Sequence, residues 1–162
     1  MKKRKHLPFY GVGPFIGGFQ IAITIIAVAL SCLGYFDFGK IEFLNIPFKL
    51  VGVSLIVLGC YLFYGAHYKA KLFDMVAENK LVTTGVYSIV RNPVYSGFLS
   101  ACTGIVCIAS NVVLFVVPLI CWAFMTVVLK MFEEKWLKAL YGDEYVQYCK
   151  RVNRCIPCLK YI

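Results

Sequence analysis

The chain has 162 residues, of which 60% are hydrophobic and only 15% are charged. Soluble domains carry charge on roughly a quarter of their residues, so this composition excludes a water-soluble globular protein. The net charge of +9 fits basic clusters that face anionic lipid headgroups, and we predict membrane lipids rather than nucleic acid as their partner. The length leaves room for one domain, which we place over residues 1–162.

Long windows without charge predict an all-α integral membrane protein, because about 20 mostly apolar residues cross a hydrocarbon core of ~30 Å. The predicted spans cover residues 13–36, 46–66, 93–109 and 112–131. Glycines in the first two spans permit close helix contact. From Asn92 to Leu129 the sequence has no Asp, Glu, Lys or Arg, and Ser110-Asn111 is its only polar pair. We therefore predict that the last two spans form a helical hairpin with its tip at these two residues.

The distribution of basic residues predicts the orientation. Lys and Arg gather before the first span, in the loop before the third span and after the fourth, whereas the hairpin tip has none. The positive-inside rule then places both termini and the 68–92 loop in the cytoplasm.

Two helix signals flank the hairpin. Asn92-Pro93 is typical of a helix start, since Asn is a favoured cap and Pro is tolerated in the first turn. Apolar residues at helical spacing over 133–152 predict a cytoplasmic C-terminal helical segment, interrupted at Gly142, that lies on the membrane surface or caps the site.

The hairpin brings two polar flanks to the same membrane face. Arg91, Asn92 and Tyr95 begin the third span, while Glu133 and Glu134 follow the fourth. The helix start and Arg91 favour a carboxylate, and Glu133 could bind an amine or ribose hydroxyls. The same residue types also fit a ligand-free interfacial belt with solvated carboxylates.

Aromatic residues near these polar groups could bind further parts of the same ligand. Tyr87 and Tyr95 offer faces for a purine ring or a sulfonium cation. An amino-acid head, a sugar, a base and a cation together describe S-adenosylmethionine.

Four motifs in the second half of the chain occur in a fixed order. They are Leu81-Val82-Thr83-Thr84-Gly85-Val86-Tyr87, Arg91-Asn92-Pro93-Val94-Tyr95-Ser96-Gly97, Glu133-Glu134, and Tyr141-Gly142-Asp143-Glu144-Tyr145 continuing to Ile156-Pro157. As a set they resemble the isoprenylcysteine carboxyl methyltransferase family. The Asn-Pro-x-Tyr and Glu-Glu parts are also similar to phospholipid N-methyltransferases. The resemblance covers residues 79–157, about half of the chain.

The resemblance implies a bundle of transmembrane helices with a cytosolic pocket, methyl transfer from S-adenosylmethionine, and S-adenosylhomocysteine as product. It implies a cofactor-binding part over 79–157 and no metal. The cofactor contacts carry over onto Asn79, Lys80, Leu81, Val82, Tyr87, Asn92, Pro93, Val94, Tyr95 and Glu133.

We assign Arg91 and Glu134 to catalysis. The predicted acceptor is lipophilic and enters from the inner leaflet, with carboxyl O-methylation favoured and a phospholipid or a small thiol as alternatives. A carboxylate or thiolate acceptor needs no general base, whereas an amine needs one, for which Glu134 and His67 are the candidates.

Two positions depart from the eukaryotic prenylcysteine enzymes. Asn92 stands where they have His, and Leu129, followed by Lys130, stands where they carry an Arg that is thought to face the substrate carboxylate. Cofactor binding therefore transfers to this chain better than the identity of the substrate.

Two readings of other classes remain open. A four-span thiol oxidoreductase using Cys155 and Cys158 would lose activity when either Cys is changed and would be indifferent to Glu133. A non-catalytic membrane module would not bind S-adenosylmethionine at all.

Overall fold

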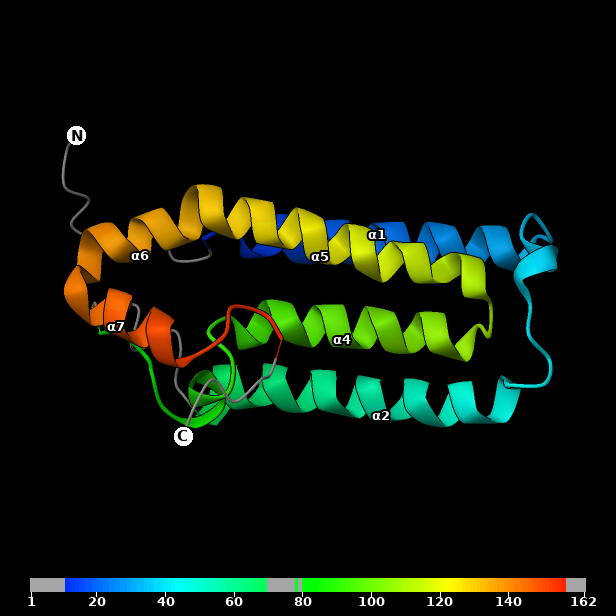
Figure 1. Ribbon diagram of the computed structural model, residues 1–162, viewed down its shortest axis with the longest axis horizontal. Helices are drawn as coiled ribbons and strands as arrows, with labels where there is room; N and C mark the ends of the chain where they lie inside the picture. Colours follow the sequence, from blue (N-terminus) through cyan, green and yellow to red (C-terminus); the bar gives the residue numbers. More distant parts are fainter. Residues whose placement is uncertain (1–10, 70–77, 79, 157–162) are drawn as a thin grey trace.

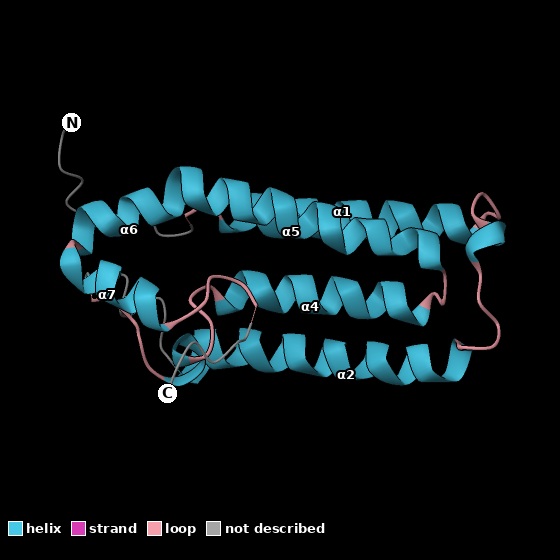
Figure 2. Ribbon diagram, viewed as in Figure 1, coloured by secondary structure: helices cyan, strands magenta, loops and turns pink. Residues whose placement is uncertain are grey.

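The computed structural model describes residues 11–69, 78 and 80–156, and over these residues it is helical with isolated bridges and no strand. Figures 1 and 2 show a bundle of helices that run side by side along one long axis. The α-helices are α1 Gly13–Cys32, α2 Asn45–Tyr64, α4 Pro93–Ile108, α5 Val116–Val128, α6 Glu134–Tyr141 and α7 Asp143–Arg151. The predicted all-α class is confirmed.

Within the described part of the chain, three helical stretches are long and apolar enough to cross a membrane: Gly13–Cys32, Asn45–Lys69 and Val112–Tyr141. The helix α4 is apolar but has only 16 residues. The first helix ends four residues before the predicted boundary, because Gly34 turns the chain with φ +90°. The last stretch continues past residue 131 without a break, through a π-helical turn at Leu129–Glu133 into α6.

The predicted hairpin is present, with its tip at Ser110 and Asn111. Ser110 adopts φ +50°, which reverses the chain between α4 and the 3-10 turn Val112–Phe115. Asn111 is fully buried. Its Oδ1 accepts a hydrogen bond from the Val113 amide at 3.0 Å, and its Nδ2 donates to Ser31 Oγ at 3.0 Å. The tip is thereby tied to the end of α1.

Helices α2 and α4 approach one another at the level of their backbones. A Cβ added to Gly59 would lie 2.6 Å from the Gly97 carbonyl oxygen, and one added to Gly52 would lie 2.6 Å from the Gly104 carbonyl oxygen. Only glycine permits this approach, and the expectation of close contact for the second span is confirmed. The contact fixes the start of α4 against the end of α2.

The C-terminal segment closes the fold at one end of the bundle. Gly142, with φ +55°, separates α6 from α7 as predicted. After α7 the chain runs back beside the start of α4 (Figure 1), where Val90 and Asn153 form a parallel bridge. The Arg91 amide donates to the Asn153 carbonyl at 2.8 Å. Residues more than 60 positions apart in the chain thus lie side by side at this end of the bundle.

Candidate functional site

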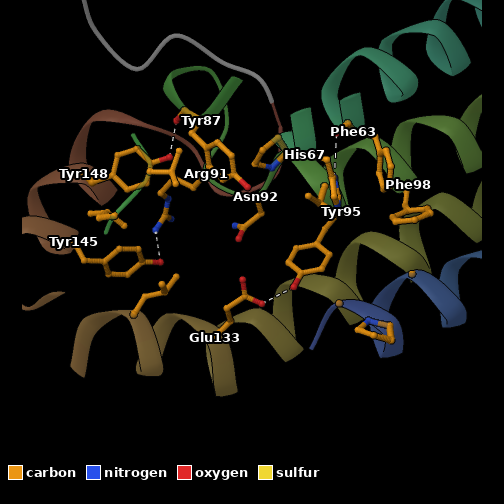
Figure 3. Close-up of a pocket in the computed structure, with 18 of the residues that line it drawn as sticks. Phe63, His67, Tyr87, Arg91, Asn92, Tyr95, Phe98, Glu133, Tyr145 and Tyr148 are labelled. Atoms are coloured by element: carbon orange, nitrogen blue, oxygen red, sulfur yellow. Dashed lines mark hydrogen bonds between the residues drawn. The ribbon is translucent and has the colours of Figure 1, made fainter. Parts of the chain in front are cut away.

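A cavity of about 400 Å³ lies at the end of the bundle where α7 and the C-terminal segment pack (Figure 3). Helix α1, the end of α2, the start of α4 and the π-helical turn before α6 all contribute to its wall. Ten residues named from the sequence line it: Lys80, Leu81, Val82, Tyr87, Arg91, Asn92, Pro93, Val94, Tyr95 and Glu133. Asn79 lies outside the described residues.

The two flanks of the hairpin meet in a hydrogen bond across this cavity. The Tyr95 hydroxyl donates to Glu133 Oε2 at 2.7 Å, and Figure 3 shows the two side chains pointing toward each other. Tyr95 is buried, and Glu133 is the last residue of the π-helical turn. Such turns inside α-helices are frequent at functional sites. The pair sets a carboxylate on one wall, where it can bind a cationic or hydroxyl group of a ligand.

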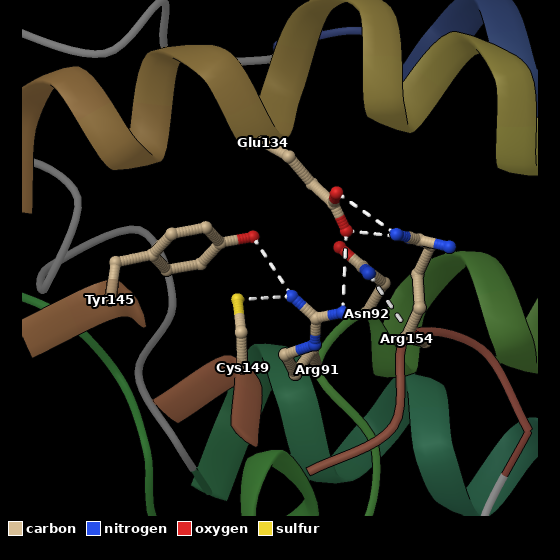
Figure 4. Close-up of polar contacts among 6 residues, drawn as sticks. All are labelled: Arg91, Asn92, Glu134, Tyr145, Cys149 and Arg154. Atoms are coloured by element: carbon tan, nitrogen blue, oxygen red, sulfur yellow. Dashed lines mark hydrogen bonds and ion pairs between the residues drawn. The ribbon is translucent and has the colours of Figure 1, made fainter. Parts of the chain in front are cut away.

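Glu134 directs its carboxylate toward Arg154 and Arg91. Successive residues of a helix project about 100° apart, so Glu133 and Glu134 face different neighbours. The Arg154 guanidinium donates from Nε to Glu134 Oε1 at 2.5 Å and from Nη2 to Oε2 at 3.0 Å (Figure 4). Arg91 Nη2 lies 3.4 Å from Oε1. Glu134, predicted as catalytic, is therefore the anchor of two arginines and is not among the described residues that line the cavity.

Arg91 lines the cavity, and its guanidinium group contacts residues of α6 and α7. Its side chain is only 8% exposed. Nη1 contacts Cys149 Sγ and donates to the Tyr145 hydroxyl at 3.3 Å, while the guanidinium carbon lies 5.9 Å from the centroid of the Tyr145 ring. Its buried Nε–H has no acceptor among the described residues. A buried donor without an acceptor costs about 1–3 kcal/mol, so the hydrogen-bonding capacity of Arg91 is not fully used.

Asn92 precedes Pro93 at the start of α4, as predicted, but the predicted side-chain cap is wrong. No side-chain hydrogen bond caps this helix. The Asn92 Nδ2 instead donates to the Arg154 carbonyl oxygen at 3.0 Å, because the C-terminal segment supplies an acceptor at that point. Pro93, Val94 and Tyr95 form the first turn and line the cavity. The start of a 16-residue helix there favours an anionic group.

Tyrosines form one side of the cavity. The Tyr148 hydroxyl donates to the Tyr87 carbonyl oxygen at 2.5 Å, which fixes α7 against the segment before α4. Burial is the main cause that raises the pKa of Tyr87 and of Tyr148 well above the usual range. Both phenols are therefore neutral at physiological pH and offer aromatic faces, while the hydroxyl of Tyr148 already donates to the Tyr87 carbonyl.

The side of the cavity toward α1 and α2 is apolar. It consists mainly of Gly17, Gly18, Ile21, Phe63 and Phe98.

His67 adds a polar group beside this apolar side. Its Nδ1 lies 3.2 Å from the Phe63 carbonyl oxygen, and its ring stacks on Phe63 with centroids 4.2 Å apart. It lines the cavity, in line with its place among the candidate bases.

Arg154, which forms an ion pair with Glu134, was not identified from the sequence. Arg154 lies in the basic tail, where no spacing distinguishes it from its neighbours. Tyr145 and Tyr148 stood in the helical apolar stripe of the predicted tail, and that stripe was the signal that α7 packs inward. Both are buried.

Cys155 is buried at 5% exposure. Burial raises the pKa of its thiol to about 11, so the reactive thiolate is scarce at neutral pH. Cys158, its predicted redox partner, lies outside the described residues. The environment of Cys155 is that of a structural cysteine.

Comparisons with known proteins place this architecture in a family. A model of the phospholipid methyltransferase family matches residues 48–144. Protein-S-isoprenylcysteine O-methyltransferase B of Arabidopsis thaliana is 40% identical over 49% of this chain and 41% of its own length. The Schizosaccharomyces pombe protein-S-isoprenylcysteine O-methyltransferase is 30% identical over 82% of this chain and 59% of its own length. Methanethiol S-methyltransferase 1 of Bradyrhizobium diazoefficiens is 29% identical over 67% of this chain and 38% of its own length.

The chain spans about half the length of the curated relatives it matches. No solved structure is a significant match to it. The family match extends from α2 to the start of α7 and includes the hairpin and Glu133-Glu134, the elements on which the resemblance was based. The chain therefore belongs to the phospholipid methyltransferase family, and its relatives include isoprenylcysteine methyltransferases, as the motifs predicted.

Proposed function

We propose that the chain is an integral membrane methyltransferase that uses S-adenosylmethionine to methylate a lipophilic acceptor, most similar in activity to isoprenylcysteine carboxyl methyltransferases. The observation that supports this function is the charge pattern of the cavity. A cationic wall at Arg91 faces a carboxylate at Glu133, with tyrosines and an apolar side between them.

The residues present fit the cofactor. Arg91 and Arg154 share one carboxylate, Glu134, so this wall has a net positive charge suited to the carboxylate of the amino-acid head. Glu133 is suited to the ammonium group or to ribose hydroxyls, and Tyr87 to the adenine ring or the sulfonium. A cavity of about 400 Å³ lies within the usual range for small-molecule sites.

S-adenosylmethionine, when bound, supplies an electrophilic methyl group on a sulfonium. The chain's own residues would orient the reactants and exclude water. Transfer to an anionic acceptor removes two opposite charges, so a dry wall of tyrosines and phenylalanines favours it, provided that the reacting atoms are aligned. A carboxylate acceptor needs no base, and the carboxylate of Glu134 is already engaged by two arginines.

The membrane placement is part of the proposal. We infer four spans, with the 16-residue α4 as the third, and cytoplasmic termini by the positive-inside rule. The cavity then lies at the cytoplasmic end of the bundle. Its apolar side, between α1 and α2, would receive the hydrocarbon part of an acceptor from the inner leaflet. The whole chain forms one methyltransferase domain.

A small thiol is the second candidate acceptor, and Leu129 favours it. At this position eukaryotic prenylcysteine enzymes carry an Arg, whereas Leu129 is fully buried in a cluster with Ile16 and Met125. The position therefore offers no cation to an acceptor carboxylate. A relative named methanethiol S-methyltransferase 1 is consistent with this alternative.

Calorimetric titration of the detergent-solubilised protein with S-adenosylhomocysteine tests the cofactor site. The unaltered protein should bind, and Glu133→Gln should bind about 10- to 100-fold more weakly, because a charged hydrogen bond contributes about 1.5–3 kcal/mol. Glu144→Gln is the matched control, since Glu144 is exposed on α7 and does not line the cavity. Absence of binding by the unaltered protein would exclude this function.

A second assay separates the acceptors. Incubation with a donor labelled in its methyl group should place label on a prenylated cysteine with a free carboxylate if O-methylation is correct. Label on a small thiol alone would support the second candidate.

A further inference from the structure

We propose that Arg154 is a positioning residue for the ligand carboxylate, acting through Glu134 on Arg91. The inference deepens the proposed function and rests on it. Arg154 belongs to the segment after α7 and does not line the cavity, so its effect on the ligand must pass through the residues between them.

The geometry makes Glu134 a shared anchor. Arg154 engages both of its oxygens, at 2.5 and 3.0 Å, in a bidentate pair. Arg91 approaches Oε1 from the other side at 3.4 Å (Figure 4). Charge-assisted N–H···O bonds are typically 2.7–2.9 Å long, so the contact of Arg91 is the looser of the two. Arg154 thus takes the larger share of the Glu134 charge.

The way in which the two arginines share Glu134 determines the net charge on the Arg91 side of the cavity. With both arginines present, two guanidinium groups share one carboxylate, and a net positive charge remains at the wall. Without the guanidinium of Arg154, Glu134 would turn fully to Arg91 and neutralise it. Because the Arg91 side chain is only 8% exposed, water would screen this change weakly.

The backbone of Arg154 makes contacts that do not involve its guanidinium group. Its carbonyl oxygen accepts from the Asn92 Nδ2 at 3.0 Å and from the Asn92 amide at 3.2 Å. A side-chain substitution leaves these two bonds in place. Arg154→Gln therefore tests the guanidinium while the segment stays bound to the start of α4.

Two nucleosides distinguish positioning from a general structural effect. S-adenosylhomocysteine carries the amino-acid head, whereas 5′-methylthioadenosine has the same adenosine part without a carboxylate. We expect Arg154→Gln to weaken S-adenosylhomocysteine binding about 10-fold or more, the effect of losing a charge-assisted contact. Binding of 5′-methylthioadenosine should stay within about twofold, as for an interaction that the change does not touch.

Two further variants sharpen the test. Arg154→Lys keeps the charge but loses the bidentate geometry, so it should restore S-adenosylhomocysteine affinity to within about threefold of the unaltered protein. In the background of Arg91→Gln, adding Arg154→Gln should change affinity by no more than about twofold, because an effect that passes through Arg91 cannot act without it.

Equal weakening of both nucleosides, or no weakening of either, would overturn the inference while leaving the proposed function intact. Binding of neither nucleoside by the unaltered protein would overturn the proposed function and this inference with it. If Arg154→Gln does not fold, as judged by its thermal midpoint, Arg154→His replaces it in this comparison, and Arg154→Lys remains the variant that keeps the charge. Selective loss for S-adenosylhomocysteine would then support the inference, and a parallel loss for both ligands would contradict it.

Discussion

Replacing Gly59 by alanine should force α2 and α4 apart at the end of the bundle that holds the cavity. The added Cβ would lie 2.6 Å from the Gly97 carbonyl oxygen, whereas ordinary contacts begin near 3.4 Å. The helices would therefore have to separate by about 0.8 Å, the difference between these distances. The obstacle is backbone, which no rotamer change removes.

The free energy of unfolding should fall by about 2 kcal/mol. Overpacking costs about 1–3 kcal/mol, and the upper end applies here because the clash involves backbone. Alanine recovers about 1 kcal/mol of helix propensity. For a chain of this length about 2 kcal/mol corresponds to a fall of roughly 4–8 °C in the thermal midpoint.

The assay is thermal unfolding in detergent together with S-adenosylhomocysteine titration. Gly18→Ala is the matched control, because no atom lies within 4 Å of the added Cβ, and its midpoint should not fall. Gly52→Ala meets the Gly104 carbonyl oxygen at 2.6 Å and should lower the midpoint similarly. It lies about 10 Å farther from the cavity along α2, so it should weaken binding less than Gly59→Ala.

An unchanged or raised midpoint for Gly59→Ala would show that the helices can part without cost, and the inferred backbone contact would be refuted. Equal loss of ligand affinity in Gly52→Ala and Gly59→Ala would refute the claim that this contact positions the cavity wall.

Three other predictions concern the C-terminal part. Tyr148→Phe removes the hydroxyl that bonds the Tyr87 carbonyl at 2.5 Å, and should lower the free energy of unfolding by about 1–2 kcal/mol; the exposed Tyr35→Phe is the control, and equal midpoints would contradict the bond. The rate of Cys155 alkylation, measured by mass spectrometry of the folded protein, should keep rising with pH up to about 11, because burial raises the pKa of this thiol to about 11; rapid labelling at pH 8 would show an accessible thiolate. Gly142→Ala should destabilise the protein by about 1–2 kcal/mol, since its φ of +55° disfavours side chains; a higher midpoint would contradict that conformation.

The sequence was sufficient to predict the parts of the fold that follow from local pattern. The absence of charge between Asn92 and Leu129 predicted the hairpin, and the polar pair at its centre predicted the tip. The flanks of this stretch then had to meet, and the bond between Tyr95 and Glu133 shows that they do. Ten of the twelve named site residues line one cavity.

The contacts that were missed depend on long-range packing. The Asn92 side chain donates to the Arg154 carbonyl oxygen and does not cap α4. The local sequence cannot show that this carbonyl lies at the start of α4. Glu134 was named as a candidate base for an amine acceptor, and its contacts with Arg154 and Arg91 depend on residues 20 and 43 positions away in the chain. The π-helical turn at Leu129–Glu133 has no simple sequence signature, and so the unbroken continuation of this helix into α6 was not predicted.

Residues 152–156 pack against the start of α4, and this contact separates membrane insertion in time from completion of the cavity. The hydrophobic helices can enter the bilayer one after another during translation, since each satisfies its own backbone. The wall around Asn92 is complete only when the segment 62 residues downstream has left the ribosome. Under the proposed function, a newly inserted chain should therefore pass through a stage in which it is embedded in lipid but does not bind the methyl donor, and this stage should end once synthesis has passed this segment.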